Sequence, residues 1–286
     1  MLPRAPTPPP SKMKFKNIVD LLTEAGVPEP MADARILWRE LSGQSALFPP
    51  KAEDESNSPA LKDAIERRAK REPVQYILGK VGFYREEYEV SPDCLIPRQD
   101  TEILVDTAVR LLTRGARFID LCTGSGCVAI STLCNTSSTE ATAVDVSGAA
   151  LEIAKRNAEK NGVSGRISFK ELDLLTKGAE LKKEGPFYAV LSNPPYVSPS
   201  AYSSLEKEIY REPKIAFLGG EDGTDFYRAL IPLSKELIEK DGFIAFEIGF
   251  DQGELLRSLA ADNGLCCEII KDYSGCDRVA LLRYEK

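Results

Sequence analysis

Between residues 103 and 283 the chain alternates short apolar runs with amphipathic stretches, and this alternation restricts the fold more than any other feature. The apolar runs have the length of strands, whereas the amphipathic stretches repeat their apolar residues at helical spacing. The predicted strands are residues 117–121, 142–146, 166–170, 187–192 and 243–248, and the predicted helices are residues 103–112, 127–133, 148–161 and 226–239. Strands that alternate with helices over about 170 residues predict an α/β fold with a mainly parallel, doubly wound sheet.

Two more predicted strands, residues 265–271 and 278–283, close the chain. The segment between them is too short for the crossover helix that a parallel connection needs. We therefore expect these two strands to form an antiparallel hairpin at one edge of the sheet.

The segment before the sheet has a different pattern. Apolar residues such as Ile18 and Leu22 recur at helical spacing up to about residue 71, and Gly26 and Gly43 mark helix ends. Aromatic and β-branched residues between positions 81 and 90 predict a short hairpin. We divide the chain into a disordered tail (1–12), a small helical domain (13–80), a β-hairpin linker (81–96) and the α/β domain (97–286).

Composition excludes several kinds of catalytic site. The chain has no histidine, which rules out a Ser-His-Asp triad, a Cys-His dyad and any histidine base. Its seven cysteines include no CxxC pair, so we predict no metal site. The net charge of −7 argues against a protein that binds long nucleic acid directly. No apolar run is long enough for a transmembrane helix, and the N-terminus lacks the apolar core of a signal peptide. We therefore expect a cytoplasmic protein with no membrane partner. We also expect a monomer.

A glycine-rich turn joins the strand at 117–121 to the helix at 127–133. Its residues are Cys122, Thr123, Gly124, Ser125 and Gly126. The glycines allow the backbone to approach a ligand closely, and the helix N-terminus supplies amide donors. The turn lacks both the Lys-Ser/Thr pair of a Walker loop and the full GxGxxG spacing. Taken alone, it is also compatible with a plain tight turn.

Acidic residues end the next two strands. Asp145 ends the strand at 142–146, where an acid can accept both hydroxyls of a ribose. Asp173 follows the strand at 166–170 and is placed to contact an adenine amino group, with Leu174 against the ring. Either acid taken singly has helix capping as an alternative role. Because open α/β sheets bind ligands at the carboxyl ends of adjacent strands, the three loops together predict a nucleoside-bearing cofactor.

The strand at 187–192 ends in the sequence SNPPYV, residues 192–197. Asn193 offers a side-chain carbonyl oxygen, and Pro194 contributes a backbone carbonyl for which no local N–H competes. Two such acceptors can hold both hydrogens of a substrate –NH₂ group, and Tyr196 can stack on the substrate plane. The structural alternative is a rigid turn built by Pro194 and Pro195, which does not explain the asparagine before them.

At this point the chain resembles the PrmC/HemK family, the protein-(glutamine-N5) methyltransferases of peptide chain release factors. The matching segments are REPVQYILGKVGFY (71–84), LIPRQDTEILVD (95–106), DLCTGSGCVAIS (120–131), AVDVS (143–147), SNPPYV (192–197), EPKIAFLGGEDG (212–223), EIGFDQGE (247–254) and KDYSGCDRVA (271–280). They cover nearly the whole chain after Met13. NPPY alone is shared with adenine-N6 and guanine-N2 nucleic-acid methyltransferases, whereas LIPRxDTE together with NPPY is far more specific.

The resemblance implies a seven-stranded, Rossmann-like, S-adenosylmethionine-dependent methyltransferase domain behind a small helical domain. It implies S-adenosyl-L-methionine as the donor and S-adenosyl-L-homocysteine as the product. The family's cofactor loop corresponds to Cys122–Gly126, although position 122 is commonly glycine in the family. Its ribose acid corresponds to Asp145, and its adenine wall corresponds to Asp173 and Leu174. Its catalytic substrate clamp corresponds to Asn193, Pro194, Pro195 and Tyr196, and Asn193 is also expected to contact the cofactor. Arg98, Thr101 and Glu102 match its PRxxTE motif, which is expected near the methionine end of the cofactor.

The implied function is methylation of the glutamine of the GGQ loop in class 1 peptide chain release factors, at its side-chain nitrogen N5, which tunes translation termination. The first alternative is an amino methyltransferase acting on adenine or guanine in nucleic acid, which would need a basic channel. The second alternative is a cofactor-binding or partner-binding protein without activity. The intact NPPY motif and ribose acid count against the second alternative.

Overall fold

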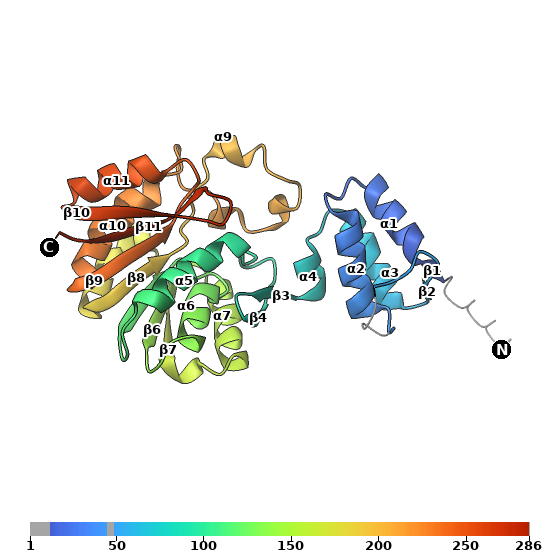
Figure 1. Ribbon diagram of the computed structural model, residues 1–286, viewed down its shortest axis with the longest axis horizontal. Coiled ribbons are helices and arrows are strands. Elements are labelled where there is room, and N and C mark those ends of the chain that lie inside the picture. The colour runs from blue at the N-terminus through green and yellow to red at the C-terminus, as the bar shows by residue number, and fades with distance from the viewer. Residues whose placement is uncertain (1–11, 45–48, 286) are drawn as a thin grey trace, which may run out of the picture. The chain divides into compact units, whose positions relative to one another are not determined.

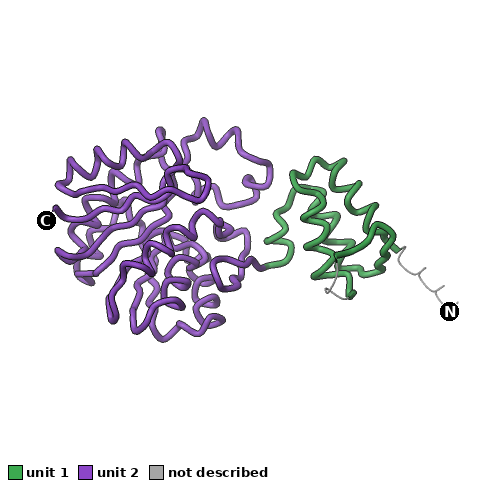
Figure 2. Tube along the Cα trace, in the orientation of Figure 1, with its two compact units in different colours: residues 1–79 green, residues 80–286 purple. Residues whose placement is uncertain are grey.

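The computed structural model describes residues 12–44 and 49–285. The chain forms two compact units, residues 1–79 and residues 80–286 (Figure 2). The disordered tail expected at residues 1–12 lies outside the described residues except for Lys12. Within the described ranges, no helix combines the length and the apolar character needed to cross a membrane.

The first unit is mainly helical. Its elements are β1 (Met13–Lys14), α1 (Phe15–Glu24), α2 (Pro30–Leu41), β2 (Glu55–Ser56), α3 (Pro59–Ala69) and α4 (Val74–Leu78). Prolines begin α2 and α3, where the missing N–H would have no partner in any case. In the core of the unit, the Phe15 and Trp38 rings meet edge to face with their centroids 5.5 Å apart. The antiparallel pair β1–β2 was not predicted, because a two-residue strand leaves no periodicity to detect.

A short hairpin, β3 (Lys80–Phe83) and β4 (Glu86–Glu89), begins the second unit. The buried side chain of Asn157 holds it in place: Oδ1 accepts from the Glu89 amide at 2.6 Å, and Nδ2 donates to the Glu89 carbonyl at 3.0 Å. The same Nδ2 donates to the Ser125 carbonyl at 2.9 Å. One asparagine therefore connects the hairpin to the glycine-rich turn.

Seven strands form the sheet of the second unit, in the order β10-β11-β9-β8-β5-β6-β7. They are β5 (Arg117–Leu121), β6 (Glu140–Asp145), β7 (Ile167–Glu171), β8 (Phe187–Ser192), β9 (Ile238–Glu247), β10 (Leu265–Lys271) and β11 (Asp277–Tyr284). The pairs among β5 to β9 are parallel, and β11 is antiparallel to both β9 and β10. The predicted α/β class, with a mainly parallel sheet and a terminal antiparallel hairpin, is confirmed.

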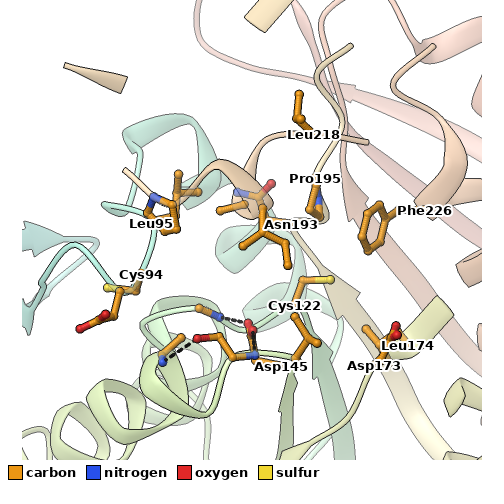
Figure 3. A pocket seen from close by; sticks show the side chains of 18 of the residues that line it. Cys94, Leu95, Cys122, Asp145, Asp173, Leu174, Asn193, Pro195, Leu218 and Phe226 are labelled. Atoms are coloured by element: carbon orange, nitrogen blue, oxygen red, sulfur yellow. Dashed lines mark hydrogen bonds between the residues drawn. The ribbon is translucent and has the colours of Figure 1, made fainter. Parts of the chain in front are cut away.

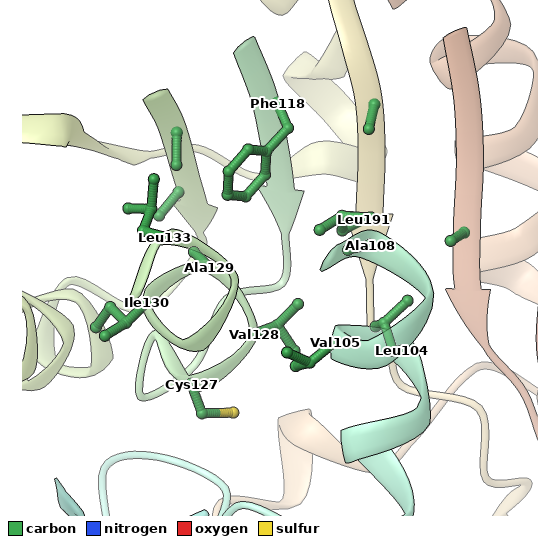
Figure 4. Close-up of a cluster of buried hydrophobic side chains, with 14 of the residues drawn as sticks. Leu104, Val105, Ala108, Phe118, Cys127, Val128, Ala129, Ile130, Leu133 and Leu191 are labelled. Carbon is green, nitrogen blue, oxygen red and sulfur yellow. The ribbon is translucent and has the colours of Figure 1, made fainter. Parts of the chain in front are cut away.

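Helices cover both faces of this sheet (Figure 1). One face carries α5 (Glu102–Leu111), α6 (Cys127–Cys134) and α7 (Gly148–Lys160), and the other carries α10 (Asp225–Leu237) and α11 (Gly253–Asp262). Successive residues of a strand point to opposite faces. Phe118 accordingly packs in the cluster with Leu104 and Val128 (Figure 4), whereas Ile119 packs in the cluster with α10. Burial on both faces explains why these strands are continuous apolar runs in the sequence.

Two regions differ from the predicted elements. Helix α11 was not predicted, although its Leu256 and Ala260 are fully buried. Strand β9 begins at Ile238, inside the helix predicted at 226–239, because Ile238 pairs with Phe187 of the neighbouring strand. This pairing is a tertiary contact that overrides the local helical pattern. The remaining short elements are η1 (Gln99–Thr101), η2 (Ser164–Arg166), α8 (Leu174–Lys177), η3 (Gly178–Lys183), α9 (Pro199–Tyr202), η4 (Ile209–Arg211) and η5 (Lys214–Ala216).

Candidate active site

The loops that follow β5, β6, β7 and β8 surround a cavity of about 350 Å³ at the carboxyl edge of the sheet (Figure 3). Seven residues singled out from the sequence line this cavity: Cys122, Gly124, Asp145, Asp173, Leu174, Asn193 and Pro195. They come together because parallel strands place their following loops at the same edge.

Other residues that line the cavity were not predicted individually from the sequence. They are, among others, Cys94, Leu95, Pro213, Ile215, Leu218 and Phe226. Most of them come from the segments before η1 and around η5, which lie inside the quoted segments LIPRQDTEILVD and EPKIAFLGGEDG. Apolar residues in such loops have no periodicity, so the family resemblance was the only available signal for Leu95, Pro213, Ile215 and Leu218, and Cys94 and Phe226 lie outside the quoted segments.

A smaller recess of about 40 Å³ shares four wall residues with the cavity, which are Leu95, Cys122, Gly124 and Asn193. The recess is also lined by Thr123, Ser125, Arg98 and Thr101. Gly126 lines neither space, and it begins helix α6 with φ at +81°. A Cβ at Gly126 would lie 2.8 Å from the Ile130 side chain and 3.1 Å from the Cβ of Ala154, so the close packing of α6 on α7 requires glycine there.

Cys122 also adopts the left-handed conformation, with φ at +59°. This conformation suits glycine, the residue that the related family commonly has at this position, and it disfavours other residues. Burial raises the pKa of the Cys122 thiol, so the sulfur is a neutral wall group at neutral pH. The cofactor loop therefore keeps a glycine-like backbone although it carries a cysteine.

We expect Cys122→Gly to keep the affinity for the predicted nucleoside-bearing cofactor within about threefold, and to leave the melting temperature unchanged or raised. Glycine relieves a left-handed conformation that costs another residue roughly 1–2 kcal/mol, and this relief offsets the lost thiol contacts. Thermal unfolding and calorimetric titration check the result. The matched control is Cys127→Gly, which changes a buried helical cysteine with no such strain and should lower the melting temperature. A drop of several degrees for Cys122→Gly would contradict this account of the loop.

The carboxylate of Asp145 holds the cofactor loop. Its Oδ2 accepts from the Gly124 amide at 2.8 Å and its Oδ1 accepts from the Ser147 amide at 2.9 Å. The cap of helix α7 is Ser147, whose Oγ accepts from the Ala150 amide, so the alternative role of Asp145 as that cap is wrong. Burial raises the pKa of Asp145, and the two amides oppose that effect.

For Asp173 the capping role does occur. Its Oδ1 accepts from the Leu175 amide at 3.0 Å and its Oδ2 accepts from the Thr176 hydroxyl at 2.8 Å, at the start of α8. The Thr176 hydrogen bond is the main cause that holds the pKa of Asp173 below its usual range. Asp173 also lines the cavity beside Leu174. Asp173 is therefore a helix cap in the wall of the cavity, and its contact with an adenine amino group stays a prediction.

The tip of β8 presents two carbonyl oxygens without donors. Asn193 directs its Nδ2 to the Thr101 hydroxyl at 3.2 Å, and within the described part of the chain no group donates to its Oδ1. Likewise, no backbone amide or side chain of the described residues donates to the carbonyl of Pro194. Pro195 and Asn193 both line the cavity. Pro194 itself lines neither the cavity nor the recess, so its part in holding a substrate –NH₂ group stays a prediction.

Tyr196 lies differently from the expectation that it stacks on a substrate plane. It lines neither the cavity nor the recess, and its hydroxyl donates to Glu247 Oε1 at 3.3 Å. Gln252 Nε2 donates to the Tyr196 carbonyl at 3.2 Å. Burial raises the pKa of Tyr196, which stays protonated at neutral pH. In this structure Tyr196 is a half-buried partner of Glu247, and substrate stacking stays a prediction.

Arg98 and Glu102, two residues of the PRxxTE motif, make different contacts. Arg98 forms an ion pair with the buried carboxylate of Glu212, which also accepts from the Ile96 amide at 3.0 Å. This pair fastens the segment before η1 to the segment before η5, and both segments line the cavity. Glu102 differs from its expected place near the cofactor, because its Oε1 accepts from the Tyr84 amide at 2.8 Å and it lines neither space.

Comparisons with known proteins give matches over most of the chain. A model of the PrmC N-terminal domain matches residues 15–79, and a model of the methyltransferase small domain matches residues 99–215. The chain is 38% identical over 269 residues to the release factor glutamine methyltransferase of Rhodospirillum rubrum, which covers 92% of this chain and 81% of that protein. It is 33% identical over 274 residues to the release factor glutamine methyltransferase of Agrobacterium fabrum, which covers 92% and 93%. Among solved structures, a ribosomal protein L11 methylase from Lactobacillus delbrueckii shares the fold, with a TM-score of 0.51 and 20% identity over 69% of this chain and 84% of that chain.

Proposed function

The chain belongs to the release factor glutamine methyltransferase family, and from this membership we propose that it methylates the GGQ glutamine of class 1 peptide chain release factors. The methyl group goes from S-adenosylmethionine to the side-chain nitrogen N5 of that glutamine. The observation that carries the proposal is that two carbonyl oxygens at the tip of β8, Asn193 Oδ1 and that of the adjacent Pro194, accept from no donor of the described residues, with Asn193 in the wall of the cavity. A primary amide offers two N–H donors in one plane, and two such acceptors can hold them.

The lining of the two spaces fits a nucleoside-bearing methyl donor. Each oxygen of Asp145 accepts one backbone amide and keeps further lone-pair capacity, so we assign this carboxylate to the ribose hydroxyls. Leu174 and Phe226 supply apolar surface for the adenine ring, and Asp173 lies beside them to accept from the adenine amino group. We assign the methionine end to the smaller recess beside Thr123 and Ser125.

When bound, S-adenosylmethionine supplies a sulfonium methyl group, whose bond to sulfur breaks, with the electron pair left on sulfur, as the bond to nitrogen forms. The glutamine nitrogen is a weak nucleophile because its lone pair is delocalised into the carbonyl. Asn193 Oδ1 and the Pro194 carbonyl each accept one N–H, which aims the nitrogen and makes it more electron-rich. Such positioning can lower a barrier by roughly 7–11 kcal/mol. After the transfer the nitrogen is acidic and releases one N–H proton to solvent water, so a chain without histidine needs no imidazole base.

Methylation of adenine or guanine in nucleic acid is the less favoured function. The same acceptors would hold a base amino group, but the net charge of −7 works against binding of a polyanion. The N-terminal segment also matches the PrmC N-terminal domain. Every residue assigned above comes from one chain, so a monomer acting in the cytoplasm, where translation terminates, is sufficient for the proposed activity.

The test is incubation with methyl-labelled S-adenosylmethionine and, in separate reactions, class 1 release factor, tRNA, rRNA and DNA. We expect label in the release factor alone, and none in a release factor whose GGQ glutamine is replaced by alanine. Label in nucleic acid without label in the release factor would support the nucleic-acid function instead. Binding of the donor with no transfer to any acceptor would support a protein that binds without activity.

A further inference from the structure

A second glycine-rich loop, GGEDG (residues 219–223), packs against the backbone of the SNPPYV tip. Its Gly219 and Gly223 are buried. A Cβ at Gly219 would lie 2.6 Å from the Pro195 carbonyl oxygen and 2.8 Å from the Cα of Tyr196. A Cβ at Gly223 would collide with the Tyr196 carbonyl oxygen. The two glycines therefore allow the GGEDG loop to lie directly on the backbone of the tip.

The side chain of Gln252 joins this contact from a third loop, the one that follows β9. Its Oε1 accepts from the Gly249 amide at 2.8 Å. Because a backbone amide can only donate, this bond fixes which end of the side chain carries the oxygen. The Nε2 end accordingly donates to the Tyr196 carbonyl at 3.2 Å and to the Gly223 carbonyl at 3.4 Å. One half-buried amide thus connects the tip, the GGEDG loop and the loop after β9.

The sequence of the tip explains why it needs partners from other loops. Pro194 and Pro195 have no N–H, so the tip has no amide of its own to donate at these two positions. Beyond them, the Val197 amide donates to the Phe217 carbonyl at 2.8 Å, and the Val197 carbonyl accepts from the Gly219 amide at 3.0 Å. Groups outside the tip therefore hold its backbone in place.

We propose that Gln252 and Gly223 are positioning residues that hold the backbone of the SNPPYV tip, so that the acceptors of the substrate clamp stay at a fixed place. The proposal rests on the function proposed above and adds a supporting layer to its clamp. Neither residue lines the cavity or the recess, so we expect neither to contact the cofactor. A misplacement of about 1 Å in an oriented group can cost about 100-fold in rate. The support should therefore affect turnover and leave binding of the methyl donor unchanged.

Gly223→Ala tests the close approach of the loop. Gly223 has φ at +79°, and the matched control is Gly115→Ala, with φ at +80° in the exposed loop before β5. Both variants put alanine in the left-handed region, but a Cβ at Gly115 meets no atom within 4 Å. We expect kcat for release factor methylation to fall about 100-fold in Gly223→Ala and to stay at the wild-type value in Gly115→Ala. The affinity for S-adenosylmethionine should stay within about threefold in both, and equal kcat values would contradict the proposal.

Two variants of Gln252 separate the two ends of its amide, and they test the proposal even if Gly223→Ala does not fold. At pH 8, Gln252→Glu keeps an oxygen for the Gly249 amide but has no N–H for the two carbonyls, whereas Gln252→Met lacks both. We expect kcat to fall about tenfold in each, the worth of one positioned hydrogen bond, with the affinity for S-adenosylmethionine unchanged. Wild-type turnover in either variant would overturn the proposal.

NMR of the free enzyme gives a readout that needs no substrate. An experiment that correlates each amide with the preceding carbonyl carbon reports the Tyr196 carbonyl through the Val197 amide. Its ¹³C signal should move upfield in both Gln252 variants, which lose the hydrogen bond, and should not move in Gly115→Ala. The side-chain N–H signals of Asn193 should move in the same variants, because the tip carries that residue. An unchanged carbonyl signal in both Gln252 variants would overturn the proposal.

The same measurements distinguish failure of this proposal from failure of the proposed function. Absence of methylation by the wild type would contradict the proposed function. The Tyr196 carbonyl signal would still decide whether Gln252 holds the tip.

Discussion

Replacing Asn193 with alanine should lower the rate of release factor methylation by about 100- to 1,000-fold, while the affinity for S-adenosylmethionine stays within about threefold. The alanine removes one of the two acceptors that aim the substrate nitrogen. Most of the cavity wall is left unchanged, because Asp145, Asp173 and Leu174 come from other strands. Single-turnover kinetics and calorimetric titration of the donor measure the two effects separately.

A matched control is available in Asn263→Ala. The amide of Asn263 donates to the Leu259 carbonyl at 2.8 Å, at the end of helix α11, and takes no part in the cavity. This control should methylate at the wild-type rate. Asn193→Asp should also be slow, because it adds a negative charge beside the cofactor although it can still accept. Near-normal turnover of Asn193→Ala would show that the SNPPYV tip does not act as the proposed clamp.

The second large effect is expected at Asp145. Asp145→Ala should weaken S-adenosylmethionine binding by at least about 100-fold, because two hydrogen bonds to a charged acceptor are lost, each worth roughly 1.5–3 kcal/mol. The substitution also releases the Gly124 amide, which the carboxylate holds at 2.8 Å in the cofactor loop. Calorimetry, or the rise in melting temperature on addition of the donor, measures the loss.

Two variants make the Asp145 experiment specific. Asp262→Ala changes an exposed aspartate at the end of α11 and should bind the donor as the wild type does. Asp173→Ala should have a smaller effect than Asp145→Ala, because Asp173 is assigned one hydrogen bond from the adenine amino group whereas Asp145 is assigned two from the ribose hydroxyls. Wild-type affinity in Asp145→Ala would refute its assignment to the ribose.

The elements that the sequence predicted well are those whose burial is regular. Strands β5, β6 and β8 are buried on both faces, so each is a continuous apolar run with a definite beginning and end. The start of β9 was missed, because Ile238 and Glu239 were predicted as helix and residues 240–242 were given no element. This part of the strand begins where Ile238 pairs with Phe187, which is far away in the chain. Where a partner strand decides the structure, local periodicity is a poor guide.

The candidate site shows the same difference between what a local sequence pattern predicts and what distant partners decide. The residue types at the strand ends were enough to predict that Asn193, Asp145 and the glycine-rich turn lie together, because parallel strands bring their carboxyl ends to one edge of the sheet. The sequence could not decide between capping and ligand binding for Asp145 and Asp173. The structure shows Ser147 as the cap of α7 and Asp173 as the cap of α8.

The sequence by itself determined the α/β class, the edge of the sheet that carries the site, and the chemistry of the groups at that edge. Only the tertiary structure decided which buried groups support the site. Asn193 bonds to Thr101 across 92 residues, Tyr196 to Glu247 across 51, and Arg98 to Glu212 across 114. The physical reason is that periodicity records which face of an element is buried, whereas a side-chain hydrogen bond depends on where two distant elements place their atoms.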